Sequence, residues 1–211
     1  MKSSQLREFY LAFVYHYGAI YSDDAYKIIK GFYPDLKEET LIKDLKKRVG
    51  KMTRGYMVLE TEDDNIFVIS NVLFTNEDLD ELFYEQGKKE FFVEKNLDVY
   101  LGNSGENFLK EYKDLRRYLE RHIKANNKTE RIIMSDIYLL KFFTTVKYSF
   151  VGDDVIKKML QEVIDLCEIE NIDKVNTLLK LIMEAYNNTP MITNRGYSPK
   201  QMREKRRLNW Y

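Results

Sequence analysis

The chain has 211 residues, of which 44% are hydrophobic and 14% aromatic, so it can fill one or two cores of ordinary size. Its single cysteine, Cys167, excludes an intramolecular disulfide, and with only two histidines beside it no structural zinc site can be assembled. We therefore expect no metal and no cofactor. No run of residues approaches the roughly 18 apolar residues of a membrane span, and the N-terminus lacks the apolar core of a signal peptide, which favours a cytoplasmic protein without a membrane partner.

The net charge is zero, but the charges are unevenly distributed along the chain. Lys and Arg outnumber Asp and Glu by 11 to 7 in residues 1–59, are outnumbered 3 to 12 in residues 60–100, and lead by 6 to 1 in residues 187–211. Such asymmetry is compatible with a polyanion-binding surface at the basic ends. It is equally compatible with ordinary solvated faces.

The first third of the chain predicts three short amphipathic helices. Residues 6–17 carry apolar side chains at spacings of three and four, and Gly18 is a natural stop. A second helix is expected after Ser22, with Pro34 ending it. A third is expected over about residues 38–51, with its apolar residues on one side at 100° per residue.

The opposite side of the third predicted helix is basic. The cations there are Lys43, Lys47 and, if the helix persists past Gly50, Arg54, and they are flanked by Lys46, Arg48 and Lys51. Two β-type runs follow, at residues 56–59 and 66–69, joined by a turn that holds Glu60, Glu62, Asp63 and Asp64. Three helices followed by a β-hairpin is the order of a winged helix, so residues 1–72 are predicted to form a winged-helix-like domain, with the third helix in the position that enters the major groove.

Two features of this predicted domain leave its ligand open. Lys and Arg suit phosphates and guanine edges, but the basic face lacks the Asn, Gln or Ser side chains that complete a base-reading set. Four carboxylates in the turn would also be repelled by phosphates. A nucleic acid, a protein partner and a merely solvated face all remain compatible with the pattern.

Residues 73–211 are predicted to form a helical domain with a basic C-terminal tail, so the fold class is mainly α. The helices expected there begin with a short one from Thr75 through Phe83 and continue with 108–123, 135–146, 153–169 and 172–186, with a flexible break at 124–129. Cys167 lies on an apolar helix face with no cationic neighbour to activate it, which predicts a packing role.

Residues 187–199 form the most unusual stretch. Six residues match a loop pattern, Asn-x-Thr-Arg/Pro-Met-Trp-x-Asn-x-Gly-x-Thr-Pro, and they are Asn187, Thr189, Met191, Asn194, Gly196 and Pro199. On these residues the chain resembles a family of uncharacterised bacterial proteins, some of which end in a cysteine-rich SEC-C zinc motif. Ile192 stands where many relatives have Trp, and no zinc-binding cysteines follow, so the resemblance implies no metal here and transfers no activity.

This loop has two interpretations from its residues. It can be a structural connector whose Asn side chains satisfy backbone groups, or a partner-binding loop. In the second case the residues that would contact the partner are Asn187, Thr189, Pro190, Met191, Asn194, Arg195 and Gly196.

The C-terminal tail combines cations with two terminal aromatic residues. Arg203, Arg206 and Arg207 suit single-stranded nucleic acid or an acidic protein groove, although basic tails are also common as solvated ends. The sequence therefore predicts a non-catalytic binding or regulatory protein that binds DNA or another nucleic acid through the third helix and the tail. The alternative is an adaptor that binds a protein through the acidic turn and the 187–199 loop. An enzyme is not expected, because no nucleophile, base, metal set or phosphate loop can be identified.

Overall fold

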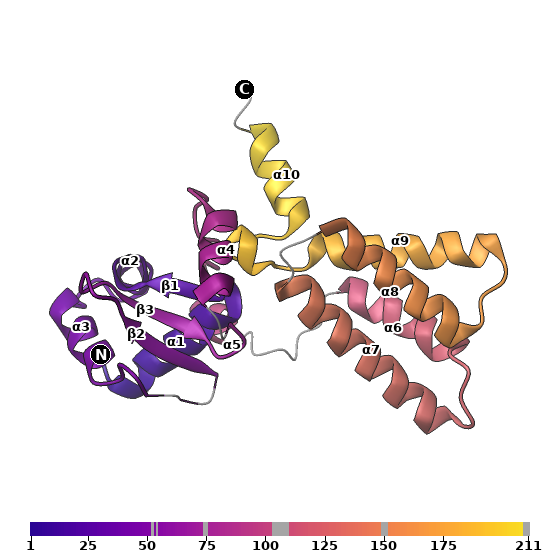
Figure 1. The fold of residues 1–211 in the computed structure, drawn as a ribbon, viewed down its shortest axis with the longest axis horizontal. Coiled ribbons are helices and arrows are strands. Elements are labelled where there is room, and N and C mark those ends of the chain that lie inside the picture. The colour runs from indigo at the N-terminus through magenta and orange to yellow at the C-terminus, as the bar shows by residue number, and fades with distance from the viewer. Residues whose placement is uncertain (52, 54, 74–75, 103–109, 149–151, 209–211) are drawn as a thin grey trace. The chain divides into compact units, whose positions relative to one another are not determined.

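The computed structural model describes residues 1–51, 53, 55–73, 76–102, 110–148 and 152–208 (Figure 1). Over these residues the chain is mainly helical, with ten α-helices and one small three-stranded sheet, which confirms the predicted mainly α composition. It forms two compact units. The first comprises residues 1–106 together with 192–196, and the second comprises residues 107–191 and 197–211.

The first unit contains all the strands. Its elements are α1 (Ser3–Tyr17), β1 (Ala19–Tyr21), α2 (Ser22–Phe32), α3 (Glu38–Lys46), β2 (Tyr56–Glu60), β3 (Ile66–Ser70), α4 (Asn76–Gln86), α5 (Leu97–Gly102) and a 3-10 turn, η1 (Ile192–Asn194). The sheet has the order β1-β3-β2 and both pairings are antiparallel. Val68 at the centre of β3 therefore pairs with Ile20 on one side and Val58 on the other.

One aromatic-rich core holds the first unit together. Phe9, Phe13 and Tyr17 on α1 are completely buried at the spacing of four that the sequence shows. All five residues of β3 are also buried. The ring of Phe67 on this strand packs edge-on against Phe83 of α4. The predicted helix 1 and both strands of the predicted hairpin are thus confirmed.

Three elements of the first unit differ from the sequence prediction. The third helix ends at Lys46 rather than Lys51, because Gly50 has a φ of 71° and its N–H donates to the carbonyl of Val58 at 3.1 Å, so strand pairing replaces the helical ladder. Strand β1 and helix α5 were not predicted. Both are too short to show a period of their own, and long-range contacts stabilise them.

The first unit also continues past residue 72, where the sequence analysis placed the boundary. Tyr100 of α5 is buried in the same hydrophobic core as α1. Its ring is stacked on that of His16 with ring centres 4.9 Å apart, and its hydroxyl lies 2.8 Å from the hydroxyl of Tyr17. The hydrophobic pattern of this segment resembles that of any helix, so its partner could not be predicted from the sequence.

The second unit is entirely helical in the part that the structure describes. Its helices are α6 (Lys110–His122), α7 (Lys128–Tyr148), α8 (Gly152–Cys167), α9 (Ile172–Asn188) and α10 (Pro199–Leu208). Their apolar stripes form a core that includes Leu115, Phe142, Val163 and Ile182. The predicted helices at 153–169 and 172–186 are confirmed.

Helix α7 starts seven residues earlier than predicted, at Lys128 instead of Ser135. An N-cap explains this start: Asn127 Oδ1 accepts from the backbone N–H of Glu130 at 2.9 Å, and Glu130 Oε2 accepts from the N–H of Asn126 at 2.8 Å. The flexible break predicted at 124–129 is therefore a shorter, ordered turn. The predicted helix start at Thr75 lies outside the described residues.

Candidate nucleic-acid interface

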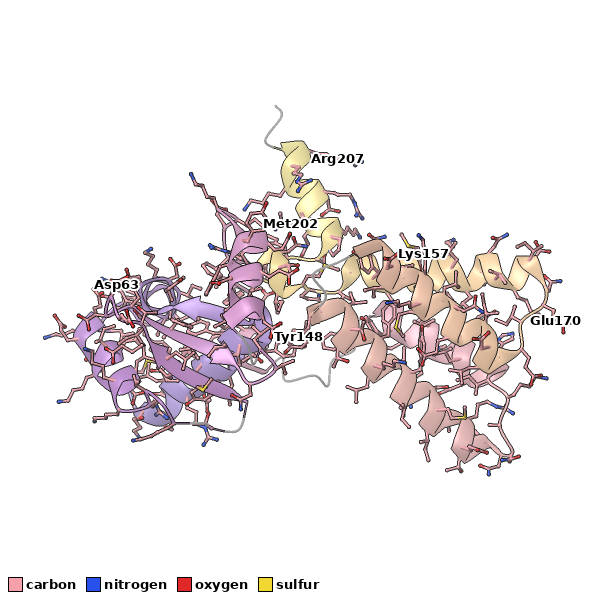
Figure 2. All side chains as sticks on the ribbon, in the orientation of Figure 1. Asp63, Tyr148, Lys157, Glu170, Met202 and Arg207 are labelled. Atoms are coloured by element: carbon pink, nitrogen blue, oxygen red, sulfur yellow. The ribbon has the colours of Figure 1, made fainter. Side chains whose placement is uncertain are left out.

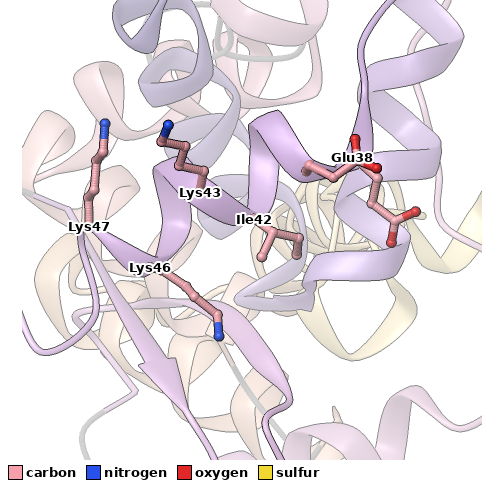
Figure 3. Close-up of a pocket in the computed structure, with 6 residues that line it drawn as sticks. Glu38, Ile42, Lys43, Lys46 and Lys47 are labelled. Carbon is pink, nitrogen blue, oxygen red and sulfur yellow. The ribbon is translucent and has the colours of Figure 1, made fainter.

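The outer face of α3 carries the cations that the sequence analysis selected. Lys43, Lys46 and Lys47 are exposed and border an open hollow of about 780 Å³ that also includes Glu38, Glu39 and Ile42. Lys43 and Lys47 extend to the same side of the helix, whereas Lys46 points the other way (Figure 3). The hollow thus has a basic end formed by the second half of α3 and an acidic end formed by its first turn.

Lys46 is engaged within the protein. Its Nζ lies 3.3 Å from Glu60 Oε1 at the end of β2, in an ion pair that is partly exposed. Lys43 and Lys47, by contrast, have no hydrogen bond or ion pair from their side chains to any described residue. Of the three cations, these two are the ones free to meet a ligand.

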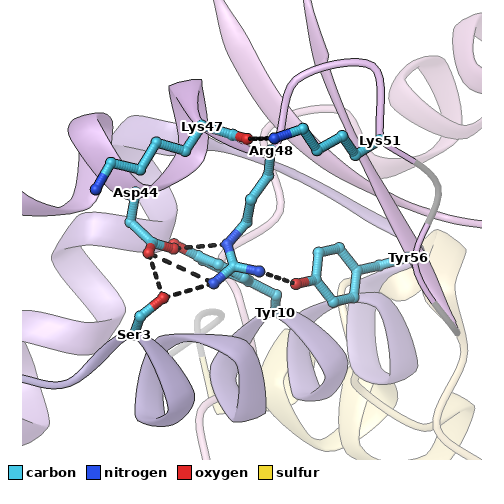
Figure 4. Close-up of polar contacts among 7 residues, drawn as sticks. All are labelled: Ser3, Tyr10, Asp44, Lys47, Arg48, Lys51 and Tyr56. Atoms are coloured by element: carbon cyan, nitrogen blue, oxygen red, sulfur yellow. Dashed lines mark hydrogen bonds and ion pairs between the residues drawn. The ribbon is translucent and has the colours of Figure 1, made fainter.

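The inner face of α3 is anchored to α1 by a polar network (Figure 4). Asp44 accepts from Ser3 Oγ at 2.6 Å, from Tyr10 OH at 3.0 Å and from Arg48 Nε at 2.7 Å. Arg48 also donates to Tyr56 OH on β2 at 3.1 Å. The only sequence signal for this network is the spacing of four between Asp44 and Arg48. Arg48 therefore points inward and does not contribute to the basic face.

The network sets the charge of Asp44. Burial raises the pKa of the Asp44 carboxyl, but hydrogen bonds from Arg48, Ser3 and Tyr10 outweigh burial and leave the pKa below its ordinary value. The hydrogen bond with Asp44 correspondingly raises the pKa of the Arg48 guanidinium. Both groups are ionised at neutral pH, and the orientation of α3 depends on this charged pair.

Two further predicted cations follow α3. Lys51 Nζ donates to the carbonyl of Lys47 at 2.6 Å, where it satisfies a backbone acceptor at the end of the helix. Its ammonium group is exposed but held against the backbone. Arg54 lies outside the described residues.

The turn between β2 and β3 is acidic and exposed, as the sequence predicts. Residues 61–65 are all exposed, and Asp63 lies at the surface (Figure 2). Asp64 has a φ of 61°, a conformation that Asp tolerates in tight turns. Glu62, Asp63 and Asp64 form no ion pair with any residue that the structure describes. The turn is thus a compact block of uncompensated negative charge.

Helix α10 holds the predicted cations of the tail. Arg203 donates to Asn187 Oδ1 at 2.8 Å, so this pair connects α10 to the end of α9. Arg206 and Arg207 are exposed, and Arg207 extends from the helix into solvent (Figure 2). Neither has a side-chain partner among the residues described.

The first half of the 187–199 loop lies in the interior of the second unit. Thr189 is fully buried, and its Oγ1 donates to Ala185 O at 2.7 Å and lies 2.6 Å from the hydroxyl of Tyr112. Met191 belongs to the core of the same unit, and Pro190 is half-buried. The structure places these side chains in packing and hydrogen bonding rather than on an open surface.

Residues 192–196 of the loop belong to the first unit. The guanidinium of Arg195 lies 4.3 Å from the ring centre of Phe91 and donates to Gly87 O at 3.0 Å. Gly196 has a φ of 86°, and a Cβ there would lie 3.1 Å from the ring of Tyr17. Asn194 is half-buried in the same segment. These contacts match the interpretation of the loop as a structural connector.

Gln86 of α4 was missed by the sequence analysis and holds this segment in place. It is completely buried, and its Nε2 donates both to Tyr17 O at 2.8 Å and to Ile192 O at 2.9 Å. A glutamine in an amphipathic helix gives no sequence signal of such a role, because its acceptors are 69 and 106 residues away.

His, Cys, Asp and Glu side chains are the groups that could hold a metal ion. Among the described residues, no group of three or more of them is arranged to do so. Burial raises the pKa of the Cys167 thiol to about 11, and the side chain packs in the core of the second unit, which confirms its predicted packing position. None of the described helices combines the length and the apolar character needed to cross a membrane.

Comparison of the chain with models of protein families, with curated proteins and with solved structures finds no match. The resemblance of the 187–199 loop to a bacterial family therefore stays a prediction. Any function must consequently be inferred from the geometry of the surface alone.

Proposed function

We propose that the elements α1 to β3 of the first unit form a winged helix that binds duplex DNA through its phosphate groups. The order α1-β1-α2-α3-β2-β3, with the sheet order β1-β3-β2, supports the winged-helix assignment. In this arrangement α3 is the helix that enters the major groove. The proposal is for a binding protein without catalytic activity.

The observation that carries the proposal is the pair of unpartnered lysines on the outer face of α3. Lys43 and Lys47 project to one side, while the Asp44 network fixes the helix from behind (Figures 3 and 4). Lysines held on a rigid helix without an internal counterion are suited to neutralise phosphates and release their bound cations. Since the same face offers no Asn, Gln or Ser for bidentate base contacts, we expect weak sequence preference.

Two other regions modify this binding. The acidic turn is repelled by phosphates, so it favours a docking in which the turn points away from the duplex. Arg206 and Arg207 on α10 supply additional phosphate contacts.

The test is a titration of fluorescently labelled duplex DNA with the full chain at several salt concentrations. Lys43→Glu/Lys47→Glu should weaken binding at least tenfold and reduce the slope of log affinity against log salt by about two, because each of the two lysines neutralises one phosphate. The matched control is Lys158→Glu/Lys180→Glu, which reverses two exposed lysines on α8 and α9. An unchanged affinity in the α3 variant, or an equal loss in both variants, would reject the proposal.

A second candidate function is an adaptor that binds a basic protein through the acidic turn. The uncompensated charge of Glu62, Asp63 and Asp64 favours it. Reversal of Glu62 and Asp63 to Lys separates the two functions. If α3 is the interface, this variant should bind DNA more tightly. If the acidic turn is the interface, the variant should lose a basic partner protein that co-purifies with the wild type.

A further inference from the structure

A second basic hollow lies in the second unit, between the C-terminal half of α6 and the first turns of α7. It has a volume of about 350 Å³. The residues that line it are Arg117, Glu120, Arg121, Lys128, Arg131 and Ile132. Four of the six are cations, and they come from two helices joined by the short turn of residues 123–127.

The positive charge of this hollow is only partly compensated. Glu120 is engaged by Arg116, whose Nε lies 3.0 Å from Glu120 Oε1, and Arg117 pairs with Asp114 at 3.1 Å. The side chains of Arg121, Lys128 and Arg131 form no ion pair with any carboxylate in the described part of the chain. Three like charges around one small hollow repel one another, so an anion among them would relieve an unfavourable arrangement.

Arg131 provides an independent observation. Its Nε is buried from solvent and has no hydrogen-bond acceptor among the described residues. Native proteins rarely leave a buried donor without an acceptor, a water or an ion as its partner. The unsatisfied N–H belongs to a residue that lines the hollow.

Local contacts fix the backbone from which two of the cations extend. Asn127 caps the first turn of α7, and the carboxylate of Glu130 accepts from the backbone N–H of Asn126. Arg116 also connects the two helices, since its Nε lies 2.9 Å from Asp136 Oδ1 on α7. The two helices thus hold the backbone positions of the cations close to one another.

We propose that this hollow binds a compact phosphate-bearing anion, either free or as the phosphoryl group of a small ester. Arginine side chains match the planar, bidentate hydrogen bonding of phosphate oxygens, and three of the four cations are arginines. The volume lies at the small end of ligand pockets, which suits a phosphate or a diphosphate better than a large ligand. Ile132 provides an apolar wall for the carbon skeleton of an ester. The site lies on a different unit from α3 and does not depend on the DNA-binding proposal.

The test is calorimetric titration of the full chain with inorganic pyrophosphate and, separately, with AMP. Arg121→Gln/Lys128→Gln should weaken pyrophosphate binding at least tenfold. Lys113→Gln/Lys157→Gln removes two cations from α6 and α8 outside the hollow and should leave it unchanged. Binding of pyrophosphate alone identifies a free anion as the ligand, whereas tighter binding of AMP identifies an ester.

An NMR titration of the wild-type protein tests the proposal even if the variants fail to fold. Pyrophosphate should shift the NMR signal of the Arg131 Nε–H and the amide signals of residues 128–132. Absence of binding, equal losses in both double variants, or shifts confined to α3 and α10 would overturn the proposal. Binding of a single-stranded oligonucleotide that depends on Arg121 and Lys128 while pyrophosphate does not bind would also overturn it, in favour of a nucleic-acid surface.

Discussion

Asp44 is the residue that attaches helix α3 to helix α1. Its side chain accepts hydrogen bonds from α1 and from Arg48, so it connects the inner face of α3 to the core. The cations on the outer face extend from a helix held by this attachment, although Asp44 itself lies on the inner face. Sequence reasoning could select the cations but not the residue that positions them.

Asp44→Asn is predicted to lower the free energy of unfolding at pH 7 by about 2 kcal/mol, the scale of hydrogen bonds to a charged group. Because the folded-state pKa of Asp44 lies below the unfolded value of 3.8, its contribution is complete above that pH and is lost as pH falls through the folded pKa. Urea unfolding at pH 7 and pH 3 should therefore show a wild-type advantage that narrows in acid. Asp35→Asn, at an exposed position, is the control and should change little. An equal advantage at both pH values would contradict the assignment.

Glu60 at the end of β2 partly neutralises the positive charge of α3. Because Glu60 forms an ion pair with Lys46, this lysine is not free to bind a phosphate. The carboxylate also adds negative charge beside the proposed interface. An exposed ion pair of this kind contributes no more than about 1 kcal/mol to stability, so its effect on binding is larger than its effect on folding.

Glu60→Gln is predicted to tighten DNA binding by about two- to fivefold, because it frees Lys46 for a phosphate and removes a repelling carboxylate. The thermal stability should stay nearly unchanged. Glu62→Gln removes one negative charge without freeing a lysine and serves as the comparison in the same DNA titration. If both substitutions tighten binding equally, Lys46 takes no part in it.

At the scale of the whole molecule, the chain builds two units that are not consecutive in sequence. Residues 192–196 belong to the first unit, although helices α6 to α9 of the second unit precede them in the chain and α10 follows them. Ile192 is completely buried there, and a Cβ built on Gly18 would lie 3.0 Å from Ile192 Cδ1. The first unit is therefore complete only when the C-terminal part of the chain is present.

Ile192→Ala is predicted to destabilise the first unit by about 2–5 kcal/mol, the range of large-to-small core substitutions. Hydrogen exchange should accelerate in α1 and α4, while α8 keeps its protection. Ile182→Ala, equally buried in the second unit, should give the reverse pattern. Accelerated exchange in α8 rather than α1 after the Ile192 substitution would show that residue 192 does not belong to the first unit.

Elements with a local residue pattern could be predicted from the sequence. Apolar spacing of three and four predicted α1, α8 and α9, and β-branched runs around an acidic turn predicted β2 and β3. Exposed charges such as Lys43 and Lys47 could also be selected, because the face of an amphipathic helix follows from its period.

Contacts between residues far apart in the sequence could be identified only from the folded chain. The pairing of β1 with β3, the insertion of residues 192–196 and the partners of Gln86 and Lys46 join segments whose own sequences do not encode a partner. The basic hollow of α6 and α7 likewise appears only when the two helices pack together. The physical reason is that periodicity specifies which face of an element is buried, whereas packing and hydrogen bonding select what that face contacts.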